Sequence, residues 1–217
     1  MSDTYKTIAH SAQTKTVIKK SSFLGFAIPL ADEQQAQDIL RDYRKRFHDA
    51  RHICYAYILR PTPHPLITDS NGKQTPQAPA SPSAPILKSS DGGEPTGTAG
   101  RPILGAIQSA EMENVMVVVV RYFGGVLLGA PGLIAAYREA ARSALETAGA
   151  ITKTDQCHLT LRFPYSQMNA VMQILKQHSV SILSNQSDMQ CTLTVEAPPT
   201  IVATIAPLLD KVASVEI

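Results

Sequence analysis

The stretch SSDGGEPTGTAGRP at 89–102 combines residue types that bind ligands in many proteins. It holds four glycines, two acids and several hydroxyl side chains, among them Asp91, Glu94, Ser90 and Thr98. Glycines allow successive backbone amides to converge on an anion, although two carboxylates repel phosphate unless Arg101 or a metal ion offsets them. An equally favoured interpretation is a tight structural loop whose acids and hydroxyls cap its own backbone. No helix or strand is expected within this stretch.

A second stretch, VVVVRYFGGVLLGAPGL at 117–133, has the order strand, Arg121, two aromatics, glycines and helix. Free amides at a helix start carry partial positive charge, and the Arg121 guanidinium adds a forked donor for an anion. The spacing of Gly124, Gly125 and Gly129 matches neither a P-loop nor the dinucleotide fingerprint, so nucleotide binding is not supported. Alternatively, these glycines are positions of close backbone packing, and Arg121 pairs with an acid of the first stretch.

A third group comprises His52, Arg51 and the pair Lys19-Lys20. A histidine at the start of a strand can act as a base, a metal ligand or a stacking platform, although a lone histidine more often caps or fills space. A triad of Ser90, His52 and Asp91 lacks the GxSxG sequence, and its adjacent serine and aspartate cannot both reach the histidine easily. A metal site from His52 and the two acids has suitable ligand types without recognisable spacing.

Tyr122 and Phe123 follow Arg121 directly. Aromatic side chains beside basic ones can stack unpaired bases while the charges follow the phosphates. If the strand continues through them, only one of the two aromatics faces solvent. The alternative is that both pack into the core.

Hydrophobic periodicity predicts the elements that must position these residues. Two short strands flank Lys19-Lys20-Ser21-Ser22, and Asp32 with Gln35 is typical of a helix start before the apolar positions that run to Phe47. Strands are expected at 52–59 and 115–120, and a helix from Pro131 to a stop at Gly149. Seven of the fifteen prolines lie in 61–85, which predicts a loop that extends to residue 88.

After residue 153 the pattern changes to alternating Cys157, Leu159, Leu161 and Phe163, followed by a helix, a hairpin, a second helix and a final strand. This βαββαβ order predicts a ferredoxin-like domain at 154–217 behind an N-terminal domain at 1–153. The fold class is therefore α+β with two domains. The three cysteines lie far apart and are expected to be core thiols.

Composition limits the classes of function. The formal net charge is only +2, with a small excess of basic residues before residue 153, so composition permits a polyanionic partner without requiring one. No apolar stretch approaches the roughly 20 residues of a membrane-spanning helix, and the first 20 residues lack the pattern of a signal peptide. A cytoplasmic protein without a membrane partner is expected.

Three sequences together resemble the motifs of the IMPACT family: DARHICYAY (49–57), SSDGGEPTGTAGRPIL (89–104) and VVVVRYFGGVLLGAPGL (117–133). KKSSF at 19–23 resembles a fourth block, and 156–217 resembles the second domain of bacterial members such as those of the YigZ branch. The resemblance implies a βαβ domain like domain IV of elongation factor G, followed by one like its domain V. Ser22, Gly93 and Pro131 depart from the usual family residues, so the loops have one basic and one acidic residue fewer than the family pattern.

The resemblance also implies regulation of translation or the stress response rather than catalysis. We therefore expect binding of RNA or the ribosome, with no cofactor and no metal, at residues clustered in the glycine-rich motifs. These are Lys20, Arg51, His52, Ser90, Asp91, Glu94, Thr98, Arg101, Arg121, Gly124, Gly125 and Gly129. One alternative is a hydrolase or phosphate-handling enzyme that uses Asp91, Glu94 and His52. Another is a protein-interaction module with a regulatory partner, recruited by the 33–47 helix or the proline-rich loop.

Overall fold

A five-stranded sheet forms the centre of the N-terminal part of this computed structural model, which describes residues 3–60, 66–68, 74–76, 84–187 and 190–216. The strand order is β2-β3-β8-β4-β7, and all neighbouring strands are antiparallel. The strands are Ala12–Ile18 (β2), Ser21–Pro29 (β3), Val115–Tyr122 (β8), His52–Leu59 (β4) and Ile86–Ser90 (β7). The strand predicted at 115–120 is therefore the central one, as its continuous β-branched sequence indicates.

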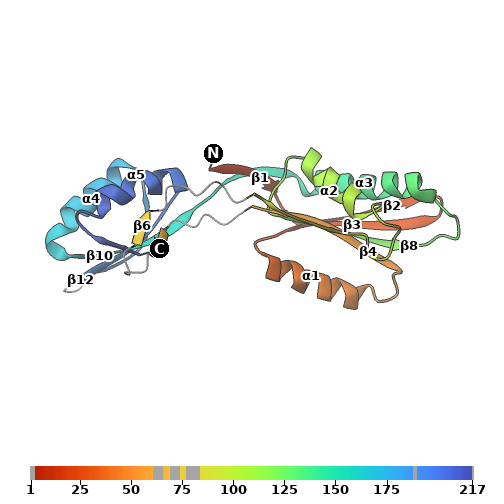
Figure 1. Ribbon diagram of the computed structural model, residues 1–217, viewed down its shortest axis with the longest axis horizontal. Helices are drawn as coiled ribbons and strands as arrows, with labels where there is room; N and C mark the ends of the chain where they lie inside the picture. Colours follow the sequence, from red (N-terminus) through yellow and green to blue (C-terminus); the bar gives the residue numbers. More distant parts are fainter. Residues whose placement is uncertain (1–2, 61–65, 69–73, 77–83, 188–189, 217) are drawn as a thin grey trace. The chain divides into compact units, whose positions relative to one another are not determined.

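Three helices cover this sheet. The helix α1 (Glu33–Arg46) joins β3 to β4, and α2 (Gly100–Ser109) joins β7 to β8. Each connection joins two strands that have one other strand between them, so the domain contains two interleaved split βαβ units. The long helix α3 (Gly129–Ala148) follows β8. Figure 1 shows α1 on one face of the sheet and α2 and α3 on the other.

The predicted start of α1 is confirmed. The Asp32 carboxylate accepts a hydrogen bond from the Gln35 amide at 2.7 Å, and the Gln35 side chain accepts one from the Ala31 amide at the same distance. This reciprocal arrangement satisfies backbone donors that the first helical turn leaves free. The apolar stripe that begins at Ala36 and ends at Phe47 packs against the sheet.

Strand β8 has both faces buried because its residues alternate between two cores. Val115, Val117 and Val119 pack with α2 and α3, whereas Met116, Val118 and Val120 pack on the α1 side. Full burial of each such side chain contributes roughly 1.5–3 kcal/mol. The same alternation places Arg121, the next residue, on the face covered by α2 and α3.

The chain divides into two units. One is made of Tyr5–Pro61 and Ala84–Lys153 (the N-terminal unit), and the other of Met1–Thr4, Thr62–Ser83 and Thr154–Ile217 (the C-terminal unit). The C-terminal unit has a sheet of order β11-β12-β10-β13 with antiparallel neighbours. This order confirms the predicted ferredoxin-like arrangement. Its elements are Cys157–Pro164 (β10), Met168–Gln177 (α4), Ser181–Ser187 (β11), Gln190–Ala197 (β12), Pro199–Leu209 (α5) and Ser214–Glu216 (β13).

The remaining elements are short. A 3-10 turn at Tyr165–Gln167 precedes α4, and the strands Thr4–Ile8 (β1) and Ala150–Thr154 (β9) form a two-stranded sheet. All three cysteines are buried and free, as expected. Among the described residues, no helix is both long and apolar enough to cross a membrane.

Three sequence-based expectations need correction. The stretch 89–102 is not wholly irregular, because β7 extends to Ser90 and α2 begins at Gly100. The loop expected at 61–88 contains the paired strands Leu66–Thr68 (β5) and Gln74–Pro76 (β6), and β7 begins at Ile86; the rest of it lies outside the described residues. Helix α2 was not predicted at all. Its glycines and proline disfavour a helix, but Ile103 and Ile107 are fully buried in the core and hold it in place.

Candidate functional site

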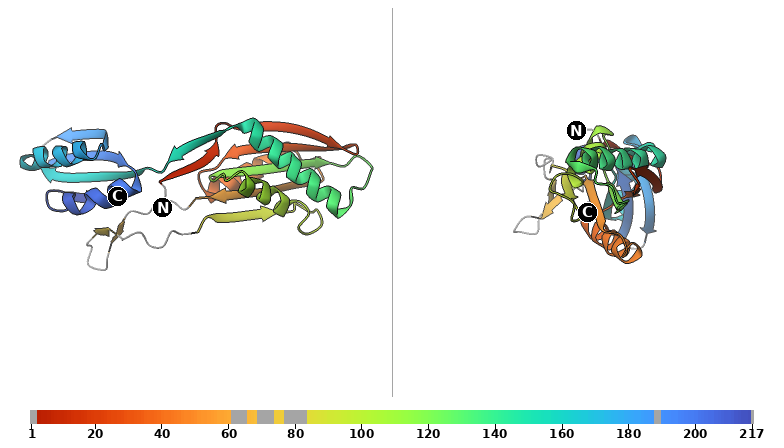
Figure 2. Two further views of the ribbon diagram at one scale, coloured as in Figure 1. Left: turned by 90° about the horizontal axis from the view of Figure 1, so that it is seen from above. Right: turned by 90° about the vertical axis from the view of Figure 1, so that its right-hand side faces the viewer.

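The predicted site residues lie at one end of the five-stranded sheet. His52, at the start of β4, pairs with Arg121 near the end of β8, and Arg121 pairs with Phe23 near the start of β3. Strand β7 ends at Ser90 beside the same end of β4. The β2–β3 turn, residues 91–99 and the segment after β8 therefore converge there (Figure 2). We call this surface the loop end, defined by residues 19–20, 51–52, 91–101 and 121–129.

Asp91 organises the first glycine-rich stretch from within. Its carboxylate accepts hydrogen bonds from the amides of Gly97, Ala99 and Gly100 at 2.8–2.9 Å. Burial alone would raise the pKa of Asp91, but these amides and the nearby Arg101 charge outweigh it and lower the pKa. The converging amides that could have held an external anion thus hold a carboxylate of the chain, which also satisfies the start of α2.

The hydroxyl side chains of this stretch make local contacts as well. Ser90 Oγ accepts a hydrogen bond from the Gly92 amide at 3.4 Å, and Thr98 Oγ1 donates to the Pro95 carbonyl at 2.6 Å. Thr98 is buried. These contacts agree with the interpretation of a loop that caps its own backbone.

Glu94 is the centre of a buried polar cluster. Its Oε1 accepts hydrogen bonds from Arg121 Nη1 at 2.5 Å and from the Tyr137 hydroxyl at 2.9 Å. Arg121 is only 5% exposed, and its guanidinium carbon lies 5.5 Å from the Phe23 ring centroid. Burial, together with the neighbouring Cys54 and Glu94, raises the pKa of Tyr137, which keeps its hydroxyl a donor at neutral pH.

This geometry corrects the expected role of Arg121. A buried guanidinium paired with Glu94 cannot meet a macromolecule at the surface, so Arg121 acts as a structural ion pair, the alternative that the sequence left open. One atom of the cluster, Arg121 Nε, has no hydrogen-bond partner among the described residues. Leaving Arg121 without Glu94 would place an uncompensated charge in the core.

His52 lies between the buried cluster and the surface. Its Nδ1 is 3.2 Å from the Gly92 carbonyl oxygen, and its Nε2 is 3.9 Å from Glu94 Oε1. On the same strand, Cys54 Sγ donates to the Asp91 carbonyl oxygen at 2.9 Å. Burial raises the pKa of the Cys54 thiol to about 12, with smaller effects of its polar neighbours, so this thiol is not a reactive thiolate at neutral pH.

The described residues form neither the Ser-His-Asp triad nor the metal site that were the alternatives from the sequence. The Asp91 carboxylate faces backbone amides and His52 Nδ1 faces a carbonyl, so the Ser90, His52 and Asp91 triad does not form. The described part of the chain contains no group of three or more His, Cys, Asp or Glu side chains placed to hold a metal ion. Asp91 and Glu94 both accept hydrogen bonds from the protein's own groups, which does not favour a hydrolytic role for them.

A tight turn of two lysines projects from the loop end. Lys19 and Lys20 connect β2 and β3 with φ angles of 45° and 66°, and both are exposed. Positive φ at both central residues is the requirement of a type I′ hairpin turn, which Asn-Gly usually fills. Left-handed backbone costs a residue with a side chain roughly 1–2 kcal/mol. The chain therefore keeps two cations at positions where glycine would cost less.

The segment after β8 packs against this turn at Gly124. A Cβ built on Gly124 would lie 2.0 Å from the Lys20 carbonyl carbon, and the Gly124 amide donates to Ser21 Oγ at 3.1 Å. The close-packing interpretation is thus confirmed for Gly124. Gly125 and Gly129 instead have positive φ angles, 82° and 70°. Helix α3 then begins without a side-chain cap or an acidic residue in its first turn.

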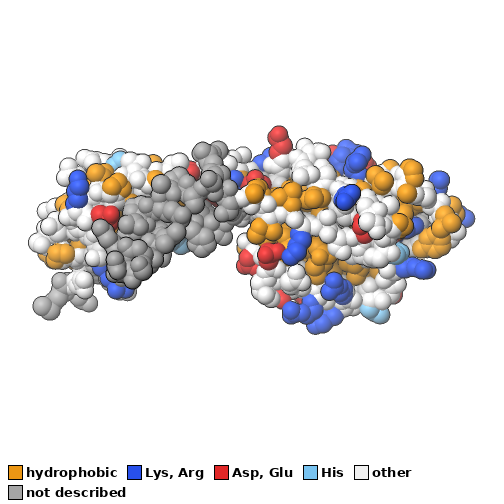
Figure 3. Space-filling view, in the orientation of Figure 1, with side chains coloured by type: hydrophobic (Ala, Val, Ile, Leu, Met, Phe, Trp, Pro, Cys, Tyr) orange, Lys and Arg blue, Asp and Glu red, His pale blue; other side chains and the backbone are white. Residues whose placement is uncertain are grey.

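The exposed charged side chains of the loop end are basic, and several exposed apolar side chains lie in the same segments. Lys19, Lys20, Arg51 and Arg101 are exposed, and so is Phe123, whereas Tyr122 is partly buried with its hydroxyl on Asp49. Val126 and Leu127 are also exposed, Leu127 by 83%. Figure 3 shows hydrophobic side chains flanked by Lys and Arg side chains at the end of the N-terminal unit where β8 leads to α3.

Several contributors to the site were not predicted from the sequence. Tyr137 lies on the apolar stripe of α3, where its spacing indicates only core packing, and Phe23 reads as an ordinary strand residue. Lys19 belongs to the third candidate group but not to the expected binding residues, although its position in a two-residue connection between strands is a signal for a turn tip. Phe123 was considered only with Tyr122, and the structure shows that Phe123 is the exposed one.

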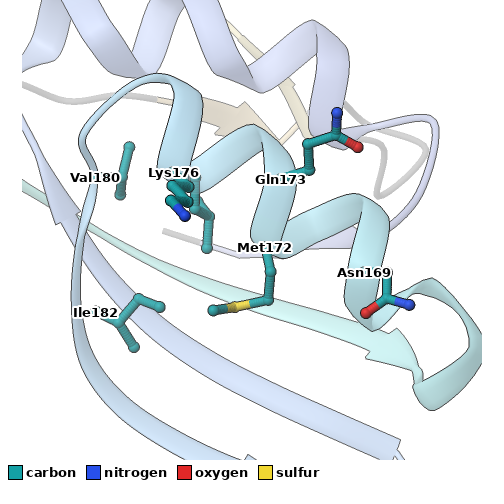
Figure 4. Close-up of a pocket in the computed structure, with 7 residues that line it drawn as sticks. Asn169, Met172, Gln173, Lys176, Val180 and Ile182 are labelled. Carbon is teal, nitrogen blue, oxygen red and sulfur yellow. The ribbon is translucent and has the colours of Figure 1, made fainter.

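A separate hollow of about 490 Å³ lies on the C-terminal unit, between α4 and β11. Figure 4 shows Met172 extending toward Ile182 across it, with Asn169 and Gln173 at other positions along the helix. Its lining is mostly apolar, and it contains none of the predicted site residues.

Comparisons with known proteins place these features in context. The Impact N-terminal domain family matches residues 19–145, which include the whole loop end. The chain is 31% identical over 186 residues to the IMPACT family member YigZ of Escherichia coli, which covers 86% of this chain and 82% of YigZ. A crystal structure of a hypothetical protein covers 100% of this chain and 99% of that one, at 28% identity and a TM-score of 0.64. The two-domain translational regulator Yih1 aligns over 66% of this chain and 47% of its own, at 25% identity and a TM-score of 0.36.

Proposed function

We propose that this chain, which belongs to the IMPACT family, is a non-enzymatic regulator of translation or the stress response that binds RNA, free or in the ribosome, through the loop end. The observation that carries the proposal is the gathering of Lys19, Lys20, Arg51 and Arg101 at one end of a sheet, all exposed.

The acids of the loop end do not cancel this charge. Asp91 is held by three backbone amides beside Arg101, and Glu94 is buried against Arg121. Asp49 is exposed and accepts a hydrogen bond from Tyr122. The exposed cations therefore outnumber the exposed acids here, although the whole chain carries a formal charge of only +2. Local concentration of charge of this kind is typical of surfaces that contact phosphates.

Backbone strain at the Lys19-Lys20 turn supports the same role. Residues held in sparsely populated conformations are found preferentially at functional sites, because elsewhere less strained sequences are equally suitable. The backbone of the turn is also supported by packing, since Gly124 lies directly against Lys20. It thus presents two amino groups from a fixed support, which reduces the entropy lost when they meet a phosphate chain.

Filter binding to a structured RNA at increasing KCl concentration tests the proposal. Four phosphate contacts on an unpaired strand give a slope of log K against log salt of about −3. Lys20→Gln, Arg51→Gln and Arg101→Gln should each weaken binding and make the slope less steep by about 0.7.

The control is Lys153→Gln. Lys153 is exposed on β9, which follows the C-terminal end of α3, whereas the N-terminal end of α3 lies at the loop end. Its removal changes net charge by the same amount and should leave the slope nearly unchanged. Binding that does not depend on salt, or that Lys153→Gln weakens as much as the other three, would reject the proposal.

A further inference from the structure

Phe123 is an exposed aromatic with a fixed backing. Its side chain is 46% exposed, although it follows the buried strand β8 directly. The Arg121 guanidinium carbon lies over its ring, 5.6 Å from the centroid, and 5.5 Å from the Phe23 centroid on the buried side. Because Glu94 anchors Arg121, the Phe123 ring rests against a side chain that does not move freely. One face of the Phe123 ring is thus covered by Arg121, and the other parts of the ring provide its exposed area.

The surroundings of Phe123 combine apolar surface with positive charge. Gly124, the next residue, packs on Lys20 and donates to Ser21, so the backbone that carries Phe123 runs beside the two-lysine turn. Val126 and Leu127 continue the exposed apolar surface. Phe123, Val126 and Leu127 are exposed within five residues, and clustered exposed apolar side chains of this kind mark interaction sites.

We propose that Phe123 is a stacking platform for an unpaired nucleobase, so that the RNA bound at the loop end is single-stranded there. This inference rests on the proposed function and specifies its substrate class. In a duplex both faces of a base are stacked on neighbours, whereas an unpaired base has a face free for an aromatic ring. The neighbouring lysines provide the complementary charge for the phosphates on either side of that base.

The absence of tryptophan from this chain allows a direct optical test. Phe123→Trp places the only tryptophan on the platform, and Tyr165→Trp places one at an exposed position, 69% exposed, in the C-terminal unit. Adding a twelve-nucleotide oligouridine should quench the emission of Phe123→Trp, because stacking brings the base against the indole. The emission of Tyr165→Trp should not change.

Fluorescence anisotropy with the same labelled oligonucleotide measures the cost of losing the ring. Phe123→Ala should weaken binding between about 5-fold and 100-fold, and Phe123→Leu should weaken it to a similar degree because it keeps apolar volume without a ring. Phe123→Tyr should stay within about twofold of the original chain. The original chain and its three Phe123 variants should all bind a twelve-base-pair RNA duplex with the same affinity. That affinity should be weaker than the affinity of the original chain for oligouridine.

The outcomes separate this inference from the proposed function. The stacking inference is wrong if Phe123→Leu does not weaken oligouridine binding and oligouridine does not quench the emission of Phe123→Trp. The proposed function stands in that case, provided that Lys20→Gln still weakens oligouridine binding. If neither oligouridine nor duplex binds, the proposed function fails. Binding to phosphatidylglycerol vesicles without any binding to oligouridine or duplex would overturn both. Phe123→Leu keeps the test valid if Phe123→Ala does not fold.

Discussion

Glu94 Oε1 accepts a hydrogen bond from Arg121 Nη1 at 2.5 Å, and both side chains are almost completely buried beneath the loop end. This pair connects the segment 91–99 with the end of β8. It therefore supports the surface residues on both sides of it, and it explains why two charged side chains of the glycine-rich motifs face inward.

Glu94→Gln should destabilise the fold strongly. The substitution leaves the Arg121 charge buried without its counter-ion, which typically costs about 3–5 kcal/mol. Urea unfolding followed by circular dichroism measures the change in the free energy of unfolding. Glu139→Gln is the control, since Glu139 pairs with Arg142 on the surface of α3 and should contribute at most about 1 kcal/mol. Equal effects of the two substitutions would contradict the role assigned to Glu94.

Asp91→Asn should lower stability by about 1–3 kcal/mol at neutral pH, because an amide nitrogen would face one of the three backbone donors now bound to the carboxylate. The pKa of Asp91 is lowered in the folded protein, so its stabilising contribution is present above the unfolded pKa of about 4 and is lost as the pH falls through the folded value.

The difference in unfolding free energy between the original chain and Asp91→Asn should therefore shrink as the pH drops below about 4. Asp38→Asn, at an exposed position paired with Arg41, serves as the comparison and should change stability little at any pH. A difference that grows in acid would have the wrong sign for this account.

Gly124→Ala and Gly105→Ala should have opposite effects. A Cβ at position 124 would overlap the Lys20 backbone at 2.0 Å, so the loop end must shift, at a cost of roughly 1–3 kcal/mol or more. Position 105 lies inside α2, where a Cβ meets nothing within 4 Å, and alanine should stabilise the helix by about 0.5–1 kcal/mol. Thermal unfolding of both variants gives the comparison. Tolerance of alanine at position 124 would show that the two loops are not packed as described.

Replacing the two-lysine turn should stabilise the fold and weaken RNA binding. Lys19→Asn together with Lys20→Gly installs the preferred type I′ turn sequence, so the free energy of unfolding should rise by up to about 1 kcal/mol. The same change removes two exposed cations and should weaken RNA binding, with the salt slope less steep by one to two. If the double variant gained stability and kept its affinity for RNA, the turn would not be part of the binding surface.

Sequence patterns predicted the elements whose signals are local. Asp32 and Gln35 marked the start of α1, and the valine run identified β8, because capping and strand preference act within a few residues. Helix α2 was missed because Gly100, Pro102 and Gly105 disfavour helices, and the burial that compensates depends on tertiary contacts.

The sequence predicts which residues belong to the candidate site. It does not distinguish the buried side chains of the site from the exposed ones. The pairing of Arg121 with an acid was one of two open interpretations, and choosing Glu94 required the position of Tyr137 on α3, which no local pattern reveals. Likewise, the positive φ angles of Lys19 and Lys20 contradict their residue type. Their conformation follows from the register of β2 and β3, which only the pairing of the strands specifies.

Photo-crosslinking of a 4-thiouridine oligonucleotide to the full chain, followed by mass spectrometry of the linked peptides, tests the central claim most directly. The account predicts crosslinks to peptides that contain residues 19–23, 51–55 or 121–129, reduced by the Lys19→Asn, Lys20→Gly double variant. Crosslinks confined to residues 154–216, or none above the level of a protein of similar charge, would contradict it.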